Sequence, residues 1–267
     1  MNPHVDFHVH TLFSADGRSS MEDQCRRAVE LGLQEVAFTE HLDLQPDDPF
    51  FGFYNREAYE AEFVRCQALF DGRLTLRRGV EVTYQQEFHD QIVNWLTGYP
   101  YDYVIGSVHA VRMEALFRED LYRRWTVRDT YTWYYEELER AARSGLFSAL
   151  GHLDLPKRYS YHIYGPVPWT DYREQVEAVL KAAVATGTGI EINTSGLASR
   201  ARETFPGPGV VALYRRLGGE VLTIGSDAHG TDQLGFGLSE AVAIAREAGF
   251  PAVATFSTRQ PVLIPLE

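Results

Sequence analysis

Nine side chains that can bind metal ions are spread along the sequence and fall at the ends of predicted strands. Six are histidines and three are carboxylates, and they are His8, His10, Asp16, His41, Glu81, His109, His152, Asp227 and His229. Neutral imidazoles and ionised carboxylates are the mixed nitrogen and oxygen ligands that zinc, iron and manganese accept. Nine such groups exceed what one ion needs, so the sequence predicts an enzyme with several metal ions.

Two pairs within this set have a spacing that favours metal binding. His8 and His10 are separated by one residue, and so are Asp227 and His229 at the far end of the set. Side chains two residues apart on a strand point to the same face of the sheet. One such pair is often structural, but chance is a poor explanation for two pairs at the ends of predicted strands.

Each remaining candidate also has a structural interpretation when it is considered alone. A histidine at the end of a strand is more often a hydrogen-bonded core residue than a ligand. Glu81 could pair with an arginine, and Asp16 has the sequence context of a turn residue. These separate explanations do not account for the whole set, because unrelated structural residues have no reason to end successive strands on one face of a fold.

Apolar strand patterns alternate with amphipathic helical patterns along nearly the whole chain. The predicted strands are Val5–His10, Glu35–Glu40, Thr75–Val82, Tyr103–Val108, Ala149–Leu153, Gly189–Asn193 and Leu222–Ser226, with a weaker one near Ala252–Phe256. The predicted helices include Met21–Leu31, Arg56–Phe70, Asp129–Arg143, Asp171–Ala185 and Ser239–Ala248. Repeated β-α units predict parallel strands joined by right-handed crossovers.

The positions of the ligand candidates favour a closed barrel over an open sheet. They follow the first and the seventh predicted strands, which a barrel makes neighbours and an open sheet separates. Active sites of (β/α) barrels lie at the C-terminal ends of the strands. We therefore expect an α/β fold, a TIM-like (β/α) barrel with seven strands. Three longer loops should form the rim of its active face, and these are Leu42–Asn55, Val111–Arg128 and Lys157–Thr170.

Composition narrows the class of protein further. The 267 residues, 45% of them hydrophobic, suit one α/β barrel. The formal net charge of −12 argues against a nucleic-acid polymer as partner, because phosphate backbones attract basic surfaces. No apolar run reaches the roughly 18 residues of a membrane span, and a strand beginning at Val5 leaves no room for a signal peptide. Cys25 and Cys66 lack CxxC spacing, so we expect reduced thiols and a cytoplasmic protein.

With these residues in place, the chain resembles the PHP (polymerase and histidinol phosphatase) family, and within it the stand-alone histidinol-phosphate phosphatases. The motifs that carry the resemblance are Asp6–Thr11, Thr39–His41, Gly79–Glu81, Tyr101–His109, Gly151–Asp154, Glu191–Gly196 and Gly225–His229. They occur in the expected order, which implies a single PHP metal-dependent phosphoesterase domain over residues 1–267. The resemblance implies a distorted seven-stranded (β/α) barrel that hydrolyses L-histidinol phosphate, a step of histidine biosynthesis, to L-histidinol and phosphate.

The resemblance also divides the nine ligands among three divalent ions, for which zinc, iron and manganese are all suitable. The implied groups are His8, His10, Glu81 and Asp227 for one ion, Glu81, His109 and His152 for a second, and Asp16, His41 and His229 for the third. Many family members carry histidine where this chain has Asp16. Because a carboxylate is a harder ligand than an imidazole, this departure leaves the third site's affinity and preferred metal open.

For hydrolysis we expect a hydroxide shared between two ions to attack phosphorus while the third ion binds another phosphate oxygen. No residue beyond the metal ligands is assigned a catalytic role. Arg158 and Arg200 follow predicted strands at the active face and are candidates for bidentate phosphate binding, although each could equally be a solvated loop residue. The side chains expected to orient the imidazoles by hydrogen bonds are Glu40, Asp154, Glu191 and Asn193.

Two other functions compete with this interpretation. A PHP phosphodiesterase or nuclease acting on small nucleotides would use the same metal chemistry. An inactive scaffold barrel, like the PHP domains attached to some polymerases, would tolerate the loss of ligands, but only Asp16 departs from the family pattern. Aromatic residues at Phe50–Tyr54, Tyr159 and Tyr161 could contact an imidazole and an ammonium group, or could pack the barrel rim. A small phosphomonoester substrate is the preferred prediction.

Overall fold

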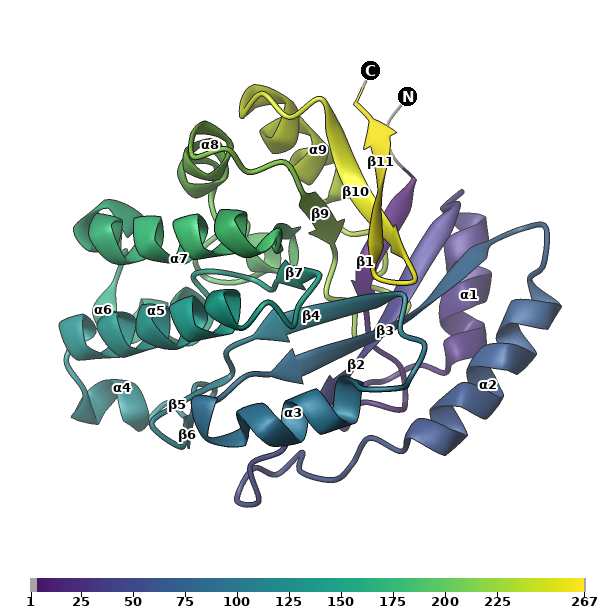
Figure 1. Ribbon diagram of the computed structural model, residues 1–267, viewed down its shortest axis with the longest axis horizontal. Helices are drawn as coiled ribbons and strands as arrows, with labels where there is room; N and C mark the ends of the chain where they lie inside the picture. The colour runs from purple at the N-terminus through teal and green to yellow at the C-terminus, as the bar shows by residue number, and fades with distance from the viewer. Residues whose placement is uncertain (1–3, 267) are drawn as a thin grey trace.

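The computed structural model describes residues 4–266, and a parallel sheet of seven strands forms its centre (Figure 1). In spatial order the strands are β1 (Val5–Val9), β2 (Glu35–Leu42), β3 (Thr75–Thr83), β4 (Tyr103–Ser107), β7 (Ala149–Leu150), β8 (Gly189–Asn193) and β9 (Leu222–Gly225). All neighbouring pairs are parallel. The first and last strands also meet, because Val9 pairs in parallel with Ala228 just beyond β9. This nearly closed barrel confirms the predicted fold class.

Helices connect the strands and cover the outside of the barrel (Figure 1). In the described residues they are α1 (Met21–Glu30), α2 (Arg56–Leu69), α3 (His89–Leu96), α4 (Leu121–Arg124), α5 (Val127–Ser144), α6 (Pro156–Tyr164), α7 (Arg173–Thr186), α8 (Pro208–Arg216) and α9 (Leu238–Glu247). Short 3₁₀ helices span Gln86–Phe88, Trp169–Tyr172 and Ser195–Ala198. The five predicted helices correspond to α1, α2, α5, α7 and α9, each within two residues of its expected bounds.

The weaker strand expected in the C-terminal segment is present and lies outside the barrel, which has the seven strands that were expected. Residues near Ala252–Phe256 form β10 (Ala252–Ser257), which pairs antiparallel with β11 (Gln260–Pro265) outside the parallel sheet. The turn of this hairpin binds the start of β4, because the backbone N–H of Arg259 donates to the Asp102 carbonyl at 2.9 Å. The hairpin therefore packs at the N-terminal end of the barrel, away from the metal-ligand candidates.

The strand and loop boundaries near the active face also differ from the sequence-based expectation. The predicted strand at Ala149–Leu153 is reduced to β7, because the backbone leaves the extended conformation at His152, where φ is 31°. The predicted loop at Lys157–Thr170 begins inside helix α6. The predicted loop at Val111–Arg128 contains a short hairpin, in which β5 (Ala110–Val111) pairs with β6 (Glu114–Ala115), and helix α4.

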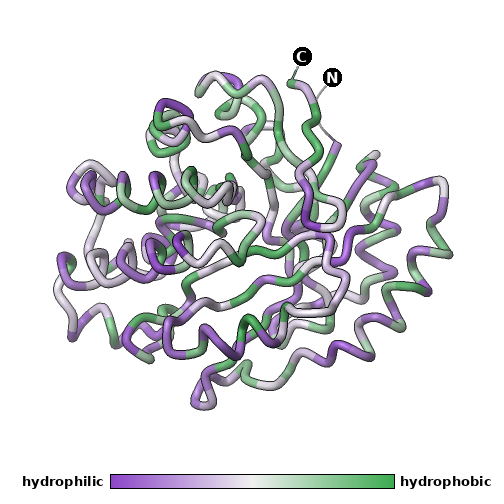
Figure 2. Tube along the Cα trace, in the orientation of Figure 1, coloured by the Kyte–Doolittle hydropathy of each residue, from purple (hydrophilic) through white to green (hydrophobic). Residues whose placement is uncertain are grey.

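The barrel strands carry the hydrophobic core, and hydrophobic residues run along them in Figure 2. Every residue of β1, β4, β8 and β9 is buried. Buried carboxylates nevertheless lie among these apolar side chains, and Asp6, Glu40, Glu81 and Glu191 all have a relative exposure of 0%. A buried charge is costly unless it is paired, so these carboxylates need hydrogen-bond donors or cations beside them. Within residues 4–266, no helix has both the length and the hydrophobicity needed to cross a bilayer.

Candidate metal centre

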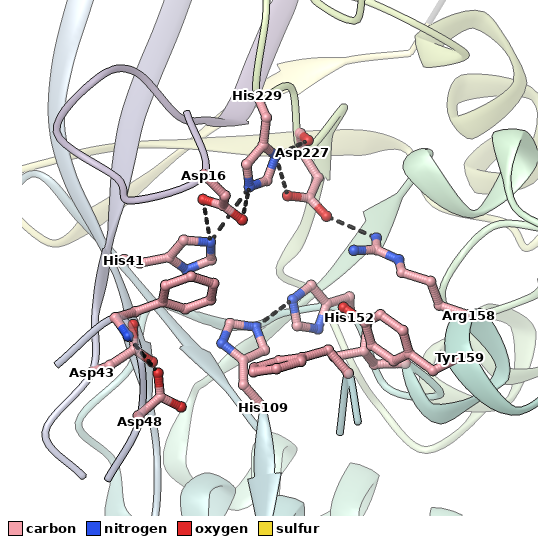
Figure 3. A pocket seen from close by; sticks show the side chains of 13 residues that line it. Asp16, His41, Asp43, Asp48, His109, His152, Arg158, Tyr159, Asp227 and His229 are labelled. Atoms are coloured by element: carbon pink, nitrogen blue, oxygen red, sulfur yellow. Dashed lines mark hydrogen bonds and ion pairs between the residues drawn. The ribbon is translucent and has the colours of Figure 1, made fainter. Parts of the chain in front are cut away.

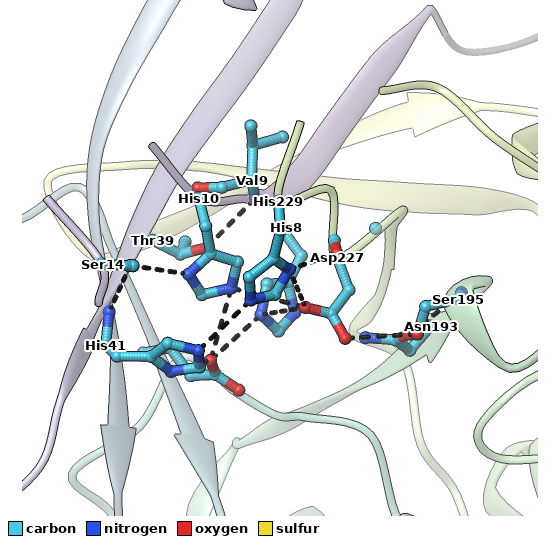
Figure 4. Close-up of polar contacts among 12 residues, drawn as sticks. His8, Val9, His10, Ser14, Thr39, His41, Asn193, Ser195, Asp227 and His229 are labelled. Carbon is cyan, nitrogen blue, oxygen red and sulfur yellow. Dashed lines mark hydrogen bonds and ion pairs between the residues drawn. The ribbon is translucent and has the colours of Figure 1, made fainter. Parts of the chain in front are cut away.

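The nine predicted ligands come together at the C-terminal ends of the barrel strands, as Figures 3 and 4 show in part. Parallel strands end at the same face of a barrel, which is why residues separated by up to 221 positions in sequence can meet there. Three sets of donor atoms close enough to share an ion occur among the described residues, and they involve His8, His10, His41, Glu81, His109, Asp227 and His229. Asp16 and His152 join these sets through the contacts described below.

The first group has the spacing of a tetrahedral metal site (Figure 4). The Nε2 atoms of His8 and His10 lie 3.3 and 3.5 Å from Glu81 Oε2, and 3.7 and 3.4 Å from Asp227 Oδ1. Ligands bound tetrahedrally at about 2.1 Å from zinc would be separated by roughly 3.4 Å. Both Nε2 atoms and Glu81 Oε2 are buried without a hydrogen-bond partner. Orphaned buried donors at this spacing fit a bound cation.

The second group uses the other oxygen of the same glutamate. Glu81 Oε1 lies 2.8 Å from His152 Nε2 and 3.3 Å from His109 Nε2, and the two imidazole nitrogens are 3.2 Å apart. Glu81 Oε1 therefore faces the second group, while Oε2 faces the first group and also lies 2.9 Å from His41 Nδ1 of the third group. This geometry agrees with the expected role of Glu81 as a bridge between two ions.

The third group lies at the open side of the site. Asp16 Oδ2 is 3.2 Å from His229 Nε2, Asp16 Oδ1 is 3.6 Å from His41 Nε2, and the two imidazole nitrogens are 3.4 Å apart. The Asp16 side chain is 41% exposed, whereas Glu81 is fully buried. The rings of His41 and His229 stack on His10 with centroid distances of 4.3 and 4.2 Å. The third group is thus adjacent to the first but better hydrated.

Hydrogen bonds to Nδ1 leave the Nε2 atoms free for metal binding. His8 Nδ1 lies 2.7 Å from Glu191 Oε1, and Asn193 donates to the other oxygen of Glu191 at 3.1 Å. His10 Nδ1 lies 3.0 Å from Ser14 Oγ, which in turn donates to Glu40 Oε2 at 2.7 Å. The predicted orienting roles of Glu191, Asn193 and Glu40 thus have matching contacts, and Glu40 acts through a serine. Contacts of this kind fix the imidazole tautomer in metal sites.

Asp154 does not fit the orienting role that the sequence suggested. Its Oδ2 accepts a 2.7 Å hydrogen bond from Lys157 Nζ, and the Nδ1 atom of His152 has no hydrogen-bond partner among the described residues. Lys157 also donates to Glu203 Oε1 at 2.7 Å. Asp154 therefore belongs to a buried ion-pair cluster beside the site, where the cation compensates for its burial.

The imidazoles and carboxylates of the site shift one another's pKa values. Burial opposes a positive charge on His8, but the carboxylates of Glu191 and Glu81 raise its pKa well above the usual histidine value. Burial would raise the pKa of Glu81, yet the imidazoles of His8 and His109 hold it well below its usual value. The pKa of His10 is lowered well below its usual value by burial and then by the neighbouring His229 and His41. The carboxylates are therefore ionised and available to a cation.

A cavity of about 310 Å³ opens onto the second and third groups (Figure 3). Its other walls are formed by acidic, basic, aromatic and aliphatic side chains, and these are Asp43, Asp48, Phe50, Phe117, Leu155, Arg158 and Tyr159. Arg158 Nη2 donates to Asp227 Oδ2 at 2.8 Å and also contacts Ser195 Oγ. Arg158 thus reaches the site, although it lies on α6 and not on the expected loop.

Arg200, the second predicted phosphate ligand, lies elsewhere. Its side chain is exposed and lines a neighbouring hollow, which shares Phe117, Arg158 and Tyr159 with the metal-facing cavity. Arg200 lies two residues beyond the 3₁₀ helix at Ser195–Ala198. The structure therefore brings one of the two predicted arginines to the candidate ligands.

Sequence reasoning missed four residues that shape the site. Ser14 and Thr83 contact the imidazoles of the candidate ligands His10 and His109, and Asp43 and Asp48 place carboxylates in the cavity wall. A period-two signal was available for two of them, because Thr83 follows Glu81 by two residues and Asp43 follows His41 by two. Ser14 and Asp48 lie on irregular loops, for which strand periodicity gives no information.

The fold and the site define a (β/α) barrel protein with clusters of metal-binding side chains at the C-terminal mouth of the barrel. The chain belongs to the PHP domain family, whose family model matches residues 6–195. Matches to individual proteins extend over nearly the full length of the chain and of the relatives, as the following comparisons show.

Two curated relatives and one solved structure illustrate the similarity. The chain is 31% identical over 261 residues to the protein named "Probable histidinol-phosphatase" of Deinococcus radiodurans, covering 96% of this chain and 97% of that one. It is 28% identical to the histidinol-phosphatase of Lactococcus lactis, covering 95% and 94%. The crystal structure of the Lactococcus lactis histidinol phosphate phosphatase with zinc, L-histidinol and phosphate superposes with a TM-score of 0.90, at 26% identity, over 97% of this chain and 98% of that chain.

Proposed function

We propose that this protein is a divalent-metal-dependent phosphatase that hydrolyses L-histidinol phosphate to L-histidinol and phosphate. The observation that carries the proposal is that Glu81 contacts two donor groups, and that Asp227 of the first group and His109 and His152 of the second line one cavity with Arg158. The names of the relatives, and the zinc, L-histidinol and phosphate bound in the similar Lactococcus lactis enzyme, support the same reaction.

Three divalent ions fit the three donor groups, with Glu81 between two of them. The expected ligands are His8, His10, Asp16, His41, Glu81, His109, His152, Asp227 and His229. Ions in such a cluster supply a nucleophile at neutral pH and neutralise charge on the reacting phosphate. The nitrogen and oxygen donors suit zinc, iron and manganese, so the ligand set leaves the identity of the ions open.

Arg158 is the residue we assign to the phosphate end of the substrate. Its guanidinium is held beside the ligand carboxylate of Asp227 and lines the cavity. A planar guanidinium can donate two parallel hydrogen bonds to a phosphate, which fixes the orientation of the phosphate as well as binding it. Arg200 is a weaker candidate, because its exposed side chain lines only the neighbouring hollow.

Asp43 and Asp48 are suited to the cationic end of the substrate. Both are at least 90% buried and line the cavity, and Asp43 Oδ2 has no hydrogen-bond partner in the described residues. Burial, followed by the negative charge of Asp43, raises the pKa of Asp48. A cation bound near the two carboxylates would offset the cost of burying their negative charge. Phe50 and Phe117, whose ring centroids are 5.9 Å apart, offer faces to an imidazole or an ammonium group.

The same carboxylates argue against the alternative of a small nucleotide substrate. A nucleotide would bring further negative charge toward Asp43 and Asp48, whereas histidinol phosphate brings an ammonium group. The net charge of −12 likewise supports a small-molecule partner over a nucleic-acid polymer. We also propose a cytoplasmic location, for which the two buried free cysteines give support.

We further propose that the PHP domain extends over residues 1–267, beyond the range of the family model. Strand β9 lies after that range and pairs with β8, and the loop that follows it carries Asp227 and His229. A domain that ended at residue 195 would lack both ligands and the strand that supports them. Limited proteolysis that releases a folded fragment ending near residue 195 would contradict this extent.

Phosphate release from a panel of substrates tests the proposed activity. Metal-loaded protein should hydrolyse L-histidinol phosphate with a kcat/KM at least about 100-fold higher than for a phosphomonoester without an amine, because a desolvated charge pair contributes about 3 kcal/mol. A nucleoside bisphosphate should be a poor substrate. Faster hydrolysis of the nucleotide than of histidinol phosphate would replace our proposal with the nucleotide alternative.

A further inference from the structure

Thr83, the last residue of β3, touches both a cavity carboxylate and a candidate metal ligand. Its Oγ1 donates to Asp43 Oδ1 at 2.5 Å and lies 2.8 Å from His109 Nδ1. All three side chains come from adjacent strand ends: Leu42 pairs with Val82 just before Asp43 and Thr83, and Thr83 pairs with Ser107, two residues before His109. Thr83 is 3% exposed, so water does not compete for these two contacts.

The proton count in this chain of contacts determines the tautomer of His109. A threonine hydroxyl has one proton, and a carboxylate can only accept a hydrogen bond. With its proton directed to Asp43, Thr83 Oγ1 must accept from His109, which places the imidazole proton on Nδ1. The Nε2 lone pair of His109 then points toward Glu81 Oε1 and His152 Nε2, at 3.3 and 3.2 Å. That is the orientation which a metal ion in the second group requires.

We propose that Thr83 is a positioning residue that presets His109 for metal binding and links it to Asp43. The same task is performed for His8 by direct contact with Glu191, and for His10 by Ser14 in front of Glu40. Asp43 therefore serves two sites: its Oδ1 holds Thr83, while its Oδ2 is free for the substrate ammonium. The second of these roles rests on the proposed function, and the first does not.

Two variants of Thr83 separate the hydroxyl from the shape of the side chain. Thr83→Val keeps the branched shape and removes the hydroxyl, whereas Thr83→Ser keeps the hydroxyl. In zinc competition with a chromophoric chelator, without substrate, Thr83→Val should weaken the binding of one ion by 10- to 100-fold. Thr83→Ser should bind zinc within about threefold of wild type. Equal zinc affinities for Thr83→Val and wild type would overturn the proposal.

Nitrogen-15 NMR of histidine-labelled protein gives a readout that a purely structural role would not move. Wild-type and Thr83→Ser protein should show His109 protonated on Nδ1 and metallated on Nε2, and Thr83→Val should lose the fixed Nδ1 proton. A wild-type His109 protonated on Nε2 would refute the assignment. Both readouts are independent of the substrate, so they remain decisive even if histidinol phosphate is not hydrolysed.

Substrate discrimination separates the two roles of Asp43. Thr83→Val should lower kcat/KM for histidinol phosphate and for an amine-free phosphomonoester by the same factor. Asp43→Asn should lower kcat/KM for histidinol phosphate at least tenfold more than for the amine-free ester, because it also loses the charge at Oδ2. Two results would contradict the separate roles of Asp43 Oδ1 and Oδ2. One is a Thr83→Val variant that no longer prefers histidinol phosphate, and the other is an equal loss of kcat/KM for both substrates in Asp43→Asn.

Discussion

The guanidinium of Arg158 lies 2.8 Å from Oδ2 of Asp227, on the opposite side of the carboxylate from the histidines of the first donor group. Asp227 thus connects a candidate phosphate ligand with a candidate metal ligand. Arg158 is held in the first turn of α6, and its side chain is 24% exposed, so it borders the cavity with little freedom to move. This arrangement predicts that the arginine contributes to substrate binding and not only to surface charge.

Replacing Arg158 by alanine should lower kcat/KM for L-histidinol phosphate by about 10²- to 10³-fold, the usual loss for removing one donor to developing charge. The metal content, measured by mass spectrometry, should stay within one ion per chain of wild type. Arg200→Ala is the matched control, and its exposed position predicts a loss of less than about tenfold. Equal losses for the two variants would contradict the placement of Arg158 as the main phosphate ligand.

Glu81→Gln tests the bridge between the first two donor groups. The variant keeps the shape of the side chain but replaces one oxygen by an amide nitrogen, which cannot ligate a cation. We expect protein loaded with excess zinc and then desalted to retain about one ion per chain in place of three, because both Glu81-dependent sites are weakened. Undiminished metal content in this variant would show that the two groups do not share Glu81.

The exposed third group predicts a separable and weaker metal site. Asp16→Asn should lose one ion per chain on dialysis while the other two remain, because Asp16 contacts only His41 and His229 of the candidate ligands. Asp16→His should shift the third site from manganese toward zinc, since an imidazole is a softer ligand than a carboxylate. Metal competition monitored by mass spectrometry distinguishes these results, and loss of all three ions from Asp16→Asn would argue against independent sites.

The chain contains two lysines, and their different environments give a matched pair of stability predictions. Lys157 is 7% exposed and pairs with the buried Asp154, whereas Lys181 is 61% exposed and pairs with Glu177 on the surface of α7. Lys157→Met should lower the free energy of unfolding by about 3 kcal/mol, because it leaves a buried carboxylate without its cation. Lys181→Met should change it by less than about 1 kcal/mol. Urea unfolding in the presence of a chelator measures both, and a Lys157→Met variant as stable as Lys181→Met would refute the role of the buried pair.

The sequence was most informative where burial and periodicity dominate. Strands β1, β4, β8 and β9 are buried along their whole length, and α1 begins after an N-cap, because Ser20 accepts from the backbone N–H of Asp23. Helix α6 occupies a segment for which the sequence pattern predicts a loop. It begins with Pro156 after a residue without a side-chain cap, and aromatic and basic residues obscure its apolar face. Its position is set by contacts with α4 and α5, which local patterns do not encode.

The candidate site also contains residues that strand patterns predict and contacts that depend on tertiary packing. The meeting of most candidate ligands could be predicted because they lie in or just after strands whose C-terminal ends meet at one face, whereas Asp16 lies on the irregular loop after β1. Period two marks the positions of Thr83 and Asp43, but it does not give their contact with each other, which depends on the register of the neighbouring strands, and Ser14 lies on a loop without periodicity. Asp154 shows the opposite error: its proximity to His152 in sequence suggested a contact, but Lys157 is its partner in the folded chain.

Hydrolysis of L-histidinol phosphate by stripped and reloaded protein tests the central claim most directly. The protein is treated with a chelator, desalted, and assayed for phosphate release before and after addition of three equivalents of manganese or zinc. We predict no measurable turnover before addition, and recovery that follows the occupancy of the sites sharing Glu81. Turnover by the stripped protein at the rate of the reloaded protein, or none by the fully loaded protein, would contradict a metal-dependent histidinol-phosphate phosphatase.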